Sequence, residues 1–246
     1  MHDIDFDLNE EERLVRKMAF DFAEREVKPL ARKIDHEHYF PSELIPKLRE
    51  AGFMGVNVPE AFNGSGLSYL CYALIIEELA RVCASTSVIV SAHNSLCVSP
   101  ILTFGTDEQK QRYLPRLTTG SAIGCFALSE PGTGSDAARQ TCMSVRADGG
   151  WRVNGVKNWI TNGPVAEVCV LFTMEDPEKR HKGINAFIVD MDTPGVSVGR
   201  KEDKLGICGS PTSSITFEDV QLSDAQLLGK PGEGFRIAMQ SFDGGR

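Results

Sequence analysis

One segment of the chain combines hydroxyl, acidic and glycine residues in a pattern suited to binding a ligand. The apolar run 123–128 is typical of a strand and leads into Ser-Glu-Pro-Gly-Thr-Gly-Ser-Asp at residues 129–136. Gly132 and Gly134 lack a Cβ, so the backbone can approach a ligand closely there. Backbone N–H groups at the exit of a strand can donate to a pyrophosphate or a ring carbonyl. Taken alone, the segment is more typical of a solvated glycine-rich turn, and it does not match the Gly-x-Gly-x-x-Gly dinucleotide fingerprint.

A second segment adds a flat aromatic side chain within the same domain-sized stretch. Trp159, Ile160 and Thr161 follow one another, which puts an indole close to a hydroxyl. An indole can cover one side of a planar cofactor while the hydroxyl bonds the edge of that cofactor. A single tryptophan is more often a core residue. The two segments together nevertheless predict one wall of a planar cofactor site.

With these two segments at this separation, the chain resembles the acyl-CoA dehydrogenase family, and most of all its short-chain (butyryl-CoA) members. The resemblance covers all 246 residues, including the stretches 201–206 and 241–246. Two positions of the predicted loop depart from the common motif. Thr133 stands where a small residue or asparagine is usual, and Arg139 stands where glycine, alanine or serine is usual.

The resemblance implies FAD as cofactor and gives roles to individual residues. Ser129 and Thr161 would bond the flavin ring, Thr161 near the hydride-accepting nitrogen, and Trp159 would pack against the ring. The implied cofactor-binding residues are Phe126, Ala127, Leu128, Ser129, Gly132, Thr133, Gly134, Ser135, Trp159, Ile160 and Thr161. The implied substrate-binding residues are Ser135, which would also contact CoA, and Asp243, Gly244, Gly245 and Arg246 near the adenine end of CoA.

The implied reaction is the α,β-dehydrogenation of an acyl-CoA, short-chain by resemblance, to the trans-2-enoyl-CoA. A base removes the α-proton, the β-hydrogen leaves as hydride to the flavin, and donors stabilise the developing enolate oxygen. Electrons would then pass to an electron-transfer flavoprotein. The family's base is a glutamate in the C-terminal bundle or, in isovaleryl and long-chain members, at the position of Gly245. Because glycine cannot act as a base, we expect no catalytic residue in this chain and the glutamate outside it.

Two hypotheses from different classes remain open at this point. In the first, the chain is the N-terminal portion of a flavoenzyme, cut short or completed by a separate polypeptide. In the second, it is a non-catalytic flavin- or CoA-binding module or an inactive fragment. A helical segment with a suitable glutamate encoded directly downstream would favour the first hypothesis.

The first half of the chain reads as helices that would carry these segments. Asn9 with Glu12, and Thr106 with Gln109, form two predicted capping boxes. Leu14, Met18 and Phe22 recur at four-residue spacing with Val15 and Ala19 beside them, which predicts an apolar face, and Pro29 should end or bend that first helix. Further helices are predicted at 42–51 and 69–83, with an apolar segment at 87–104 interrupted by Pro100. His93, set among apolar residues in that segment, is predicted to be a satisfied core residue rather than a catalyst.

The pattern changes near residue 121 to short β-rich runs. Strands are predicted at 123–128, 141–147, 151–156, 168–174, 186–191 and 214–220, with a hairpin turn at 148–150. Helical character returns at 235–242. The expected fold class is therefore α+β. Its expected parts are an N-terminal all-α helical domain over residues 1–121, a mostly antiparallel β-barrel domain over 122–232, and the start of a truncated C-terminal helical bundle over 233–246.

Bulk properties exclude several classes of function. The net charge of −8 argues against nucleic acid or an anionic membrane as a partner. No apolar run approaches the ~18 residues of a membrane span, and the N-terminus lacks the pattern of a signal peptide. The expected location is the bacterial cytoplasm or, in a eukaryote, the mitochondrial matrix as a mature form. The seven cysteines contain no C-x-x-C pair, so we expect buried thiols and no metal site. The resemblance implies a homo-oligomer, a tetramer in the full-length family.

Overall fold

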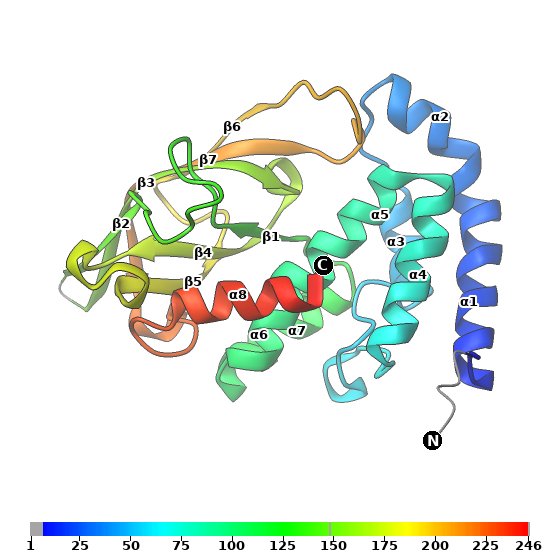
Figure 1. The fold of residues 1–246 in the computed structure, drawn as a ribbon, viewed down its shortest axis with the longest axis horizontal. Coiled ribbons are helices and arrows are strands. Elements are labelled where there is room, and N and C mark those ends of the chain that lie inside the picture. The colour runs from blue at the N-terminus through cyan, green and yellow to red at the C-terminus, as the bar shows by residue number, and fades with distance from the viewer. Residues whose placement is uncertain (1–6, 148, 246) are drawn as a thin grey trace, which may run out of the picture.

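The computed structural model describes residues 7–147 and 149–245. Figure 1 shows the helices gathered on one side, a curled sheet on the other, and the last helix running along the sheet toward the helices. The wall predicted from the sequence lies in the sheet region. The helical region and the last helix both contact this sheet region.

The first helical run begins at the predicted capping box. In α1 (Glu10–Phe22) the Asn9 side chain accepts from the Glu12 N–H at 2.9 Å, and Glu12 accepts from the Asn9 N–H at 2.8 Å. The predicted apolar face is partly wrong. Phe22 is buried, but Leu14 is 62% exposed and Met18 is 41% exposed. Val15 and Ala19, predicted on the same face, are buried with Phe22, so only this side of the predicted face packs in the core.

The helices do not end at Pro29 or Pro100, contrary to the prediction. Each proline follows a wide π-helical turn. α1 continues through η1 (Ala23–Val27) into α2 (Lys28–His36), which contains Pro29. Likewise α5 (Ala84–Ser91) continues through η3 (Ala92–Val98) into α6 (Ser99–Phe104), which contains Pro100. A proline removes one backbone donor. In a π-helical turn a carbonyl accepts from the N–H five residues later instead of four. The hydrogen-bonded helix therefore continues through each proline.

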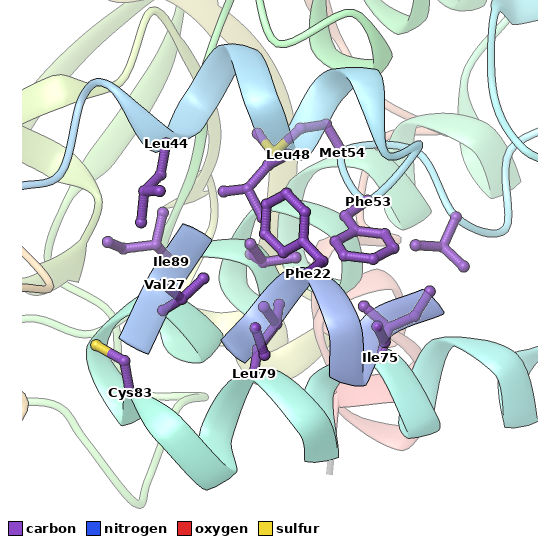
Figure 2. Packing of buried hydrophobic residues seen from close by; sticks show 14 of the residues in the cluster. Phe22, Val27, Leu44, Leu48, Phe53, Met54, Ile75, Leu79, Cys83 and Ile89 are labelled. Carbon is purple, nitrogen blue, oxygen red and sulfur yellow. The ribbon is translucent and has the colours of Figure 1, made fainter. Parts of the chain in front are cut away.

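The helix at 107–118 packs on an apolar cluster that it shares with the sheet, whereas the helices before residue 92 pack around a separate apolar cluster. α3 (Leu44–Glu50) and α4 (Tyr69–Val82) confirm the helices predicted at 42–51 and 69–83, and α7 (Asp107–Thr118) begins at the predicted Thr106–Gln109 box. Figure 2 shows side chains from α1, α3, α4, α5 and the connecting segments meeting in this cluster. The helical region therefore has an apolar core of its own.

One continuous helical run is long and apolar enough to cross a membrane by length and composition alone. This run is Ala84–Phe104, with 21 residues, and it corrects the expectation that no segment would reach that length. Most of its apolar window, 61%, is buried inside the structure, as in the core helix of many folded proteins. The feature is weak evidence for a membrane location.

The sheet region contains seven strands in a mixed, curled sheet. They are β1 (Gly124–Ala127), β2 (Met143–Ala147), β3 (Gly150–Thr161), β4 (Val168–Met174), β5 (Ile184–Asp190), β6 (Val196–Lys201) and β7 (Thr212–Ser223). The order is β1-β4-β2-β3-β7-β6, with β5 also paired to β4. Neighbours pair antiparallel except β1 with β4 and the single contact of β2 with β4. The six predicted strands are confirmed within a few residues, whereas β6 is an exposed edge strand that the sequence did not indicate. Residue 148 of the predicted turn lies outside the described residues.

His93 joins the two regions. Its Nε2 donates to the carbonyls of Met54 and Leu117 at 3.1 and 3.2 Å, and its Nδ1 accepts from the Gly124 N–H at 3.0 Å. These partners fix the Nε2–H tautomer. Burial lowers the pKa of His93 to about 4, so the ring is neutral. The prediction of a satisfied core histidine is confirmed.

The last helix, α8 (Gly234–Gly245), returns from the sheet to the helices. It contacts β5 near its start and η3 near its end. Its Ile237 and Ala238 are buried in the apolar cluster that α7 shares with the sheet. Its partly buried residues Phe235, Met239 and Phe242 pack against that cluster. The helix therefore connects the sheet region with the part of the helical region around Ser95.

Candidate functional site

The two segments singled out in the sequence meet in the structure. The Asn158 N–H donates to the Ser129 carbonyl at 2.8 Å, although 29 residues separate them along the chain. This bond joins the loop that follows β1 to the end of β3. The loop carrying Ser129 and the strand end carrying Trp159 and Thr161 thus form one surface, which we call the β1–β3 wall.

A β-bulge turns Trp159 out of the sheet. Lys157 pairs with Ile215 and Ile160 pairs with Ser213, so two residues of β3 lie opposite one residue of β7. Trp159 has φ 58°, a left-handed conformation that is rare for a bulky residue. Bulges re-aim side chains in this way. As a result the indole is 57% exposed and lies on the surface of the wall, not in the core.

Polar groups of the wall lack protein partners. The hydroxyls of Ser129 and Thr161, both half-buried, have no hydrogen-bond partner among the described residues. Gly132 and Gly134 are exposed, and a Cβ added at either would meet nothing within 4 Å. Ser135 is exposed in the same loop. The wall therefore presents unused donors and acceptors around a flat aromatic ring.

Several residues predicted to bind a cofactor face the interior instead. Phe126, Ala127, Leu128 and Ile160 are at most 9% exposed and pack in the apolar clusters on the two sides of β1. Thr133 is buried as well, and its hydroxyl donates to the Arg139 carbonyl at 2.8 Å. These side chains build the wall from behind, because alternate residues of a strand point to opposite faces and both faces of β1 are covered.

A buried ion pair lies behind the wall. Lys157 Nζ donates to Glu130 Oε1 at 2.8 Å, and both side chains are 0% exposed. Lys157 Nζ also donates to the Leu128 carbonyl at 3.2 Å and to Gln140 Oε1 at 3.1 Å. Glu130 further accepts from the Thr141 N–H and hydroxyl at 2.7 and 2.6 Å. Burial alone would raise the pKa of Glu130, but the Lys157 ammonium and the Thr141 hydrogen bonds outweigh it and hold that pKa below its ordinary value.

The sequence analysis missed Lys157, although one signal was available. Trp151 and Val153 are inward-facing residues of β3, and the same alternation continues through the half-buried Gly155 to Lys157. A lysine at an inward position of a strand needs a buried partner. Glu130 lies in the segment 129–136, which the sequence indicates as a ligand-binding loop, and its pairing with Lys157 across 27 residues cannot be read from spacing.

The end of α8 lies beside the wall and beside η3. The Phe242 ring centroid lies 5.6 Å from that of Phe126 on β1. A Cβ placed on Gly244 would lie 3.4 Å from the Tyr69 ring, and one on Gly245 would lie 3.2 Å from Ser95 Oγ. Asp243 is exposed, and Arg246 lies outside the described residues. The described part of the predicted substrate segment is the end of α8, and it therefore lies close to β1, which leads into the predicted cofactor loop.

A small pocket opens beside the end of α8. Its volume is about 210 Å³, and its lining includes Tyr69, Tyr72, Ser95, Val98 and Leu102. Drug-sized ligands occupy pockets of ~300–1,000 Å³, so this pocket suits a smaller group. A larger hollow, about 820 Å³ between α7 and the sheet, contains none of the predicted site residues.

Metal chemistry has no support in the described part of the chain, where no group of three or more His, Cys, Asp or Glu residues is placed to hold a metal ion. All seven cysteines are buried free thiols. Burial raises the pKa of Cys142 to about 11, which leaves this thiol protonated and unreactive at neutral pH.

Comparison with known proteins identifies relatives over nearly the whole chain. Residues 9–121 match the description "Acyl-CoA dehydrogenase, N-terminal domain", and residues 125–220 match "Acyl-CoA dehydrogenase, middle domain". The mitochondrial short-chain specific acyl-CoA dehydrogenase of Bos taurus is 50% identical over 241 residues, which are 98% of this chain and 58% of that protein. This chain thus spans under two thirds of the length of the curated relatives it matches first.

Solved structures agree with the sequence relatives. The butyryl-CoA dehydrogenase from Megasphaera elsdenii superimposes with a TM-score of 0.95 at 40% identity, covering 98% of this chain and 64% of that chain. A structure described as the electron transferring flavoprotein of Acidaminococcus fermentans, in work on flavin-based electron bifurcation, gives a TM-score of 0.96 at 42% identity. It covers 98% of this chain and 64% of that chain.

Proposed function

Because this chain belongs to the acyl-CoA dehydrogenase family, we propose that it supplies the flavin wall and part of the acyl-CoA site of an enzyme that dehydrogenates short-chain acyl-CoA. The observation that carries the proposal is the Asn158–Ser129 hydrogen bond, because it makes one surface of the two segments that such a site requires.

The residues present fit FAD. A planar ring needs an apolar surface to cover it and donors at its edge, and the wall offers the exposed Trp159 indole between the unpaired hydroxyls of Ser129 and Thr161. The open space around Gly132 and Gly134 lets the backbone approach a bulky cofactor. Bound FAD would supply the hydride acceptor of the reaction.

The chain's own residues would hold the reactants and exclude water. Trp159 would cover one side of the ring, and the Thr161 and Ser129 hydroxyls would bond its edge and fix its orientation. Ser135 would also contact the CoA portion, and Asp243 to Arg246 would contact CoA near its adenine end. Because Phe126 and Leu128 are packed in the core, their contribution would come through the position of the backbone they support.

The small pocket beside Gly245 supports a short acyl chain. Its volume of about 210 Å³ leaves room for a few carbons, and its lining mixes the aliphatic Val98 and Leu102 with the phenol rings of Tyr69 and Tyr72. The name of the bovine relative, which specifies short chains, points the same way. The short-chain preference rests on this agreement.

The general base would come from outside residues 7–245. Glu130, the carboxylate buried behind the wall, is already bound to Lys157, and position 245, which carries the base in isovaleryl and long-chain members, is a glycine. We therefore place the glutamate on a further segment of the same or another polypeptide. An electron-transfer flavoprotein as acceptor, a homo-oligomer, and a bacterial cytoplasmic or mitochondrial matrix location complete the proposal. The electron transferring flavoprotein title of one structural neighbour supports that acceptor.

A titration tests the proposal directly. FAD added to the purified chain should bind weakly, Trp159→Ala should weaken that binding further, and the matched exposed residue on the same strand, Val156→Ala, should leave it unchanged. Turnover of butyryl-CoA by the chain alone should be negligible, because the base is absent from the described site. Rapid dye reduction by the chain alone, or the same FAD affinity in the Trp159 variant, would contradict the proposal.

The Thr161 hydroxyl can be tested in an assembly that includes the base. Thr161→Val keeps the shape and removes the hydroxyl, so the rate of flavin reduction should fall about tenfold, or ~1.4 kcal/mol. Thr216→Val, at a half-buried threonine of β7, is the control. Stopped-flow absorbance measures both rates, and equal rates would remove Thr161 from the site.

A further inference from the structure

Lys157 is completely enclosed, which is rare for a lysine. Its ammonium donates to three acceptors, the carboxylate of Glu130, the amide oxygen of Gln140 and the carbonyl of Leu128. Three donors and three acceptors are matched. All three acceptors belong to the segment that runs from the end of β1 through the cofactor loop to β2.

Stability alone does not explain such a pair. Taking two charges out of water costs several kcal/mol per ion, and replacing a buried ion pair by well-packed neutral residues is often neutral or stabilising. In some proteins a buried ionic or polar group fixes a unique geometry.

The Leu128 contact determines which way Ser129 faces. In a trans peptide the carbonyl of one residue and the N–H of the next point in opposite directions. Since the Leu128 carbonyl points at Lys157 in the interior, the Ser129 N–H points away from Lys157. This N–H has no acceptor among the described residues, while the Ser129 carbonyl is bound by the Asn158 N–H.

The Glu130 contact holds the rest of the loop. The Glu130 carboxylate binds Thr141 and the Cys142 N–H at the far end of the loop, and its backbone pairs with Thr133 in both directions. The loop is thus closed at its base. On the other side, Lys157 is two residues from the bulged Trp159, so one side chain connects the loop and the bulge.

We propose that Lys157 is a positioning residue of the flavin site, whose buried ammonium orients the Ser129 N–H and the bulged Trp159 together toward the cofactor. This inference rests on the proposed function, because the cofactor is the FAD proposed above. Lys157 itself would touch neither FAD nor substrate, since Leu128 and Glu130 lie between it and the wall.

The test separates position from stability by neutralising the pair. Lys157→Met alone leaves Glu130 unpaired and should destabilise the chain. The double variant Lys157→Met with Glu130→Gln leaves no unpaired charge, so its thermal midpoint should return close to that of the wild type. If Lys157 positions the wall, the double variant should still bind FAD about tenfold more weakly, measured by quenching of flavin fluorescence. Arg81→Met, which breaks an ion pair of Glu78 in the helical region, should leave FAD affinity unchanged.

A second readout needs no cofactor. Arg139 is exposed in the loop, so trypsin cleavage after it, followed by mass spectrometry, reports how firmly the loop is held. The double variant should be cut several-fold faster there than the wild type. Unchanged FAD affinity together with unchanged cleavage would overturn the inference.

The two readouts also separate this inference from the proposed function. A wild type that does not bind FAD would refute the flavin site, whereas the cleavage rates would still decide whether Lys157 holds the loop. Should the double variant fail to fold, Thr141→Val removes one Glu130 contact at the exposed edge of the loop. It should show the same two changes at smaller size, and its failure to do so would overturn the inference.

Discussion

The helical region and the sheet region each bury one paired glutamate, but the surroundings of the two pairs differ. Glu78 on α4 is bound by Arg16 and Arg81, whose side chains are 48% and 39% exposed. Glu130 is bound by Lys157, and both are fully enclosed. The first pair lies at the edge of an apolar core that would form without it. The second lies beneath the wall and connects the loop after β1 with β3.

This difference shows where each region obtains its order. In the helical region, regular side-chain spacing brings apolar residues together, and charged side chains lie at the edge of that core. In the sheet region, the cofactor loop is rich in glycine and serine and has little apolar surface to bury. Its geometry depends on a few specific polar contacts, which is the usual situation at a functional site.

The largest expected effect comes from removing each of the two paired glutamates in turn. Glu130→Ala leaves the Lys157 ammonium buried without a counter-charge and should cost ~3–5 kcal/mol in the free energy of unfolding. Glu78→Ala leaves two arginines that already face water and should cost about 1 kcal/mol or less. Urea unfolding measures both. Similar costs for the two variants would mean that the pairs do not differ as described.

An intermediate effect concerns the junction of the two regions. His93 has a pKa of about 4 in the folded chain against 6.5 ordinarily, so the unfolded chain binds more protons between these values. Its contribution is therefore complete above pH 6.5 and is lost as the pH falls toward 4, by ~3 kcal/mol in total and ~2 kcal/mol by pH 5. Unfolding free energies at pH 7 and 5 measure the loss. His93→Gln should show a smaller difference between the two pH values, and an unchanged difference would exclude His93 as the cause.

The smallest expected effect concerns two neighbouring residues of α1 in the helical region, one exposed and one buried. Leu14→Ala removes an exposed side chain and should change the unfolding free energy by less than ~0.5 kcal/mol. Val15→Ala removes buried methyl groups at the next position and should cost about 1–2 kcal/mol. Thermal melts of the pair locate the buried face of α1. A larger cost at Leu14 would restore the face that the sequence predicted.

Local chemistry explains what could be predicted from the sequence. The capping boxes at Asn9 and Thr106 were predicted correctly because both partners lie three residues apart, and the strand 168–174 was found because it is apolar throughout. The predicted face of α1 was too wide because Leu14 and Val15 are both apolar, and only contacts with the neighbouring helices select between them.

The parts of the site that escaped prediction depend on long-range contacts. The two segments of the wall were identified by residue type, but no spacing rule shows that the Ser129 carbonyl meets the Asn158 N–H. The left-handed backbone of Trp159 follows from a bulge, which depends on the register with β7. Lys157 required its partner 27 residues away to be known, and β6 is too exposed and polar to show a strand pattern.

Two contacts made by η3, one to β1 and one to α8, depend on the number of residues in its wide turn. Each residue of an α-helix adds about 100° of rotation, so deleting one residue between Ala92 and Val98 would swing α6 by roughly that angle relative to α5. His93 binds the first residue of β1, and Ser95 lies against the end of α8. A one-residue deletion there would separate these two contacts. At this turn the number of residues matters more than their identity, and homologous chains that keep both contacts should also keep that number.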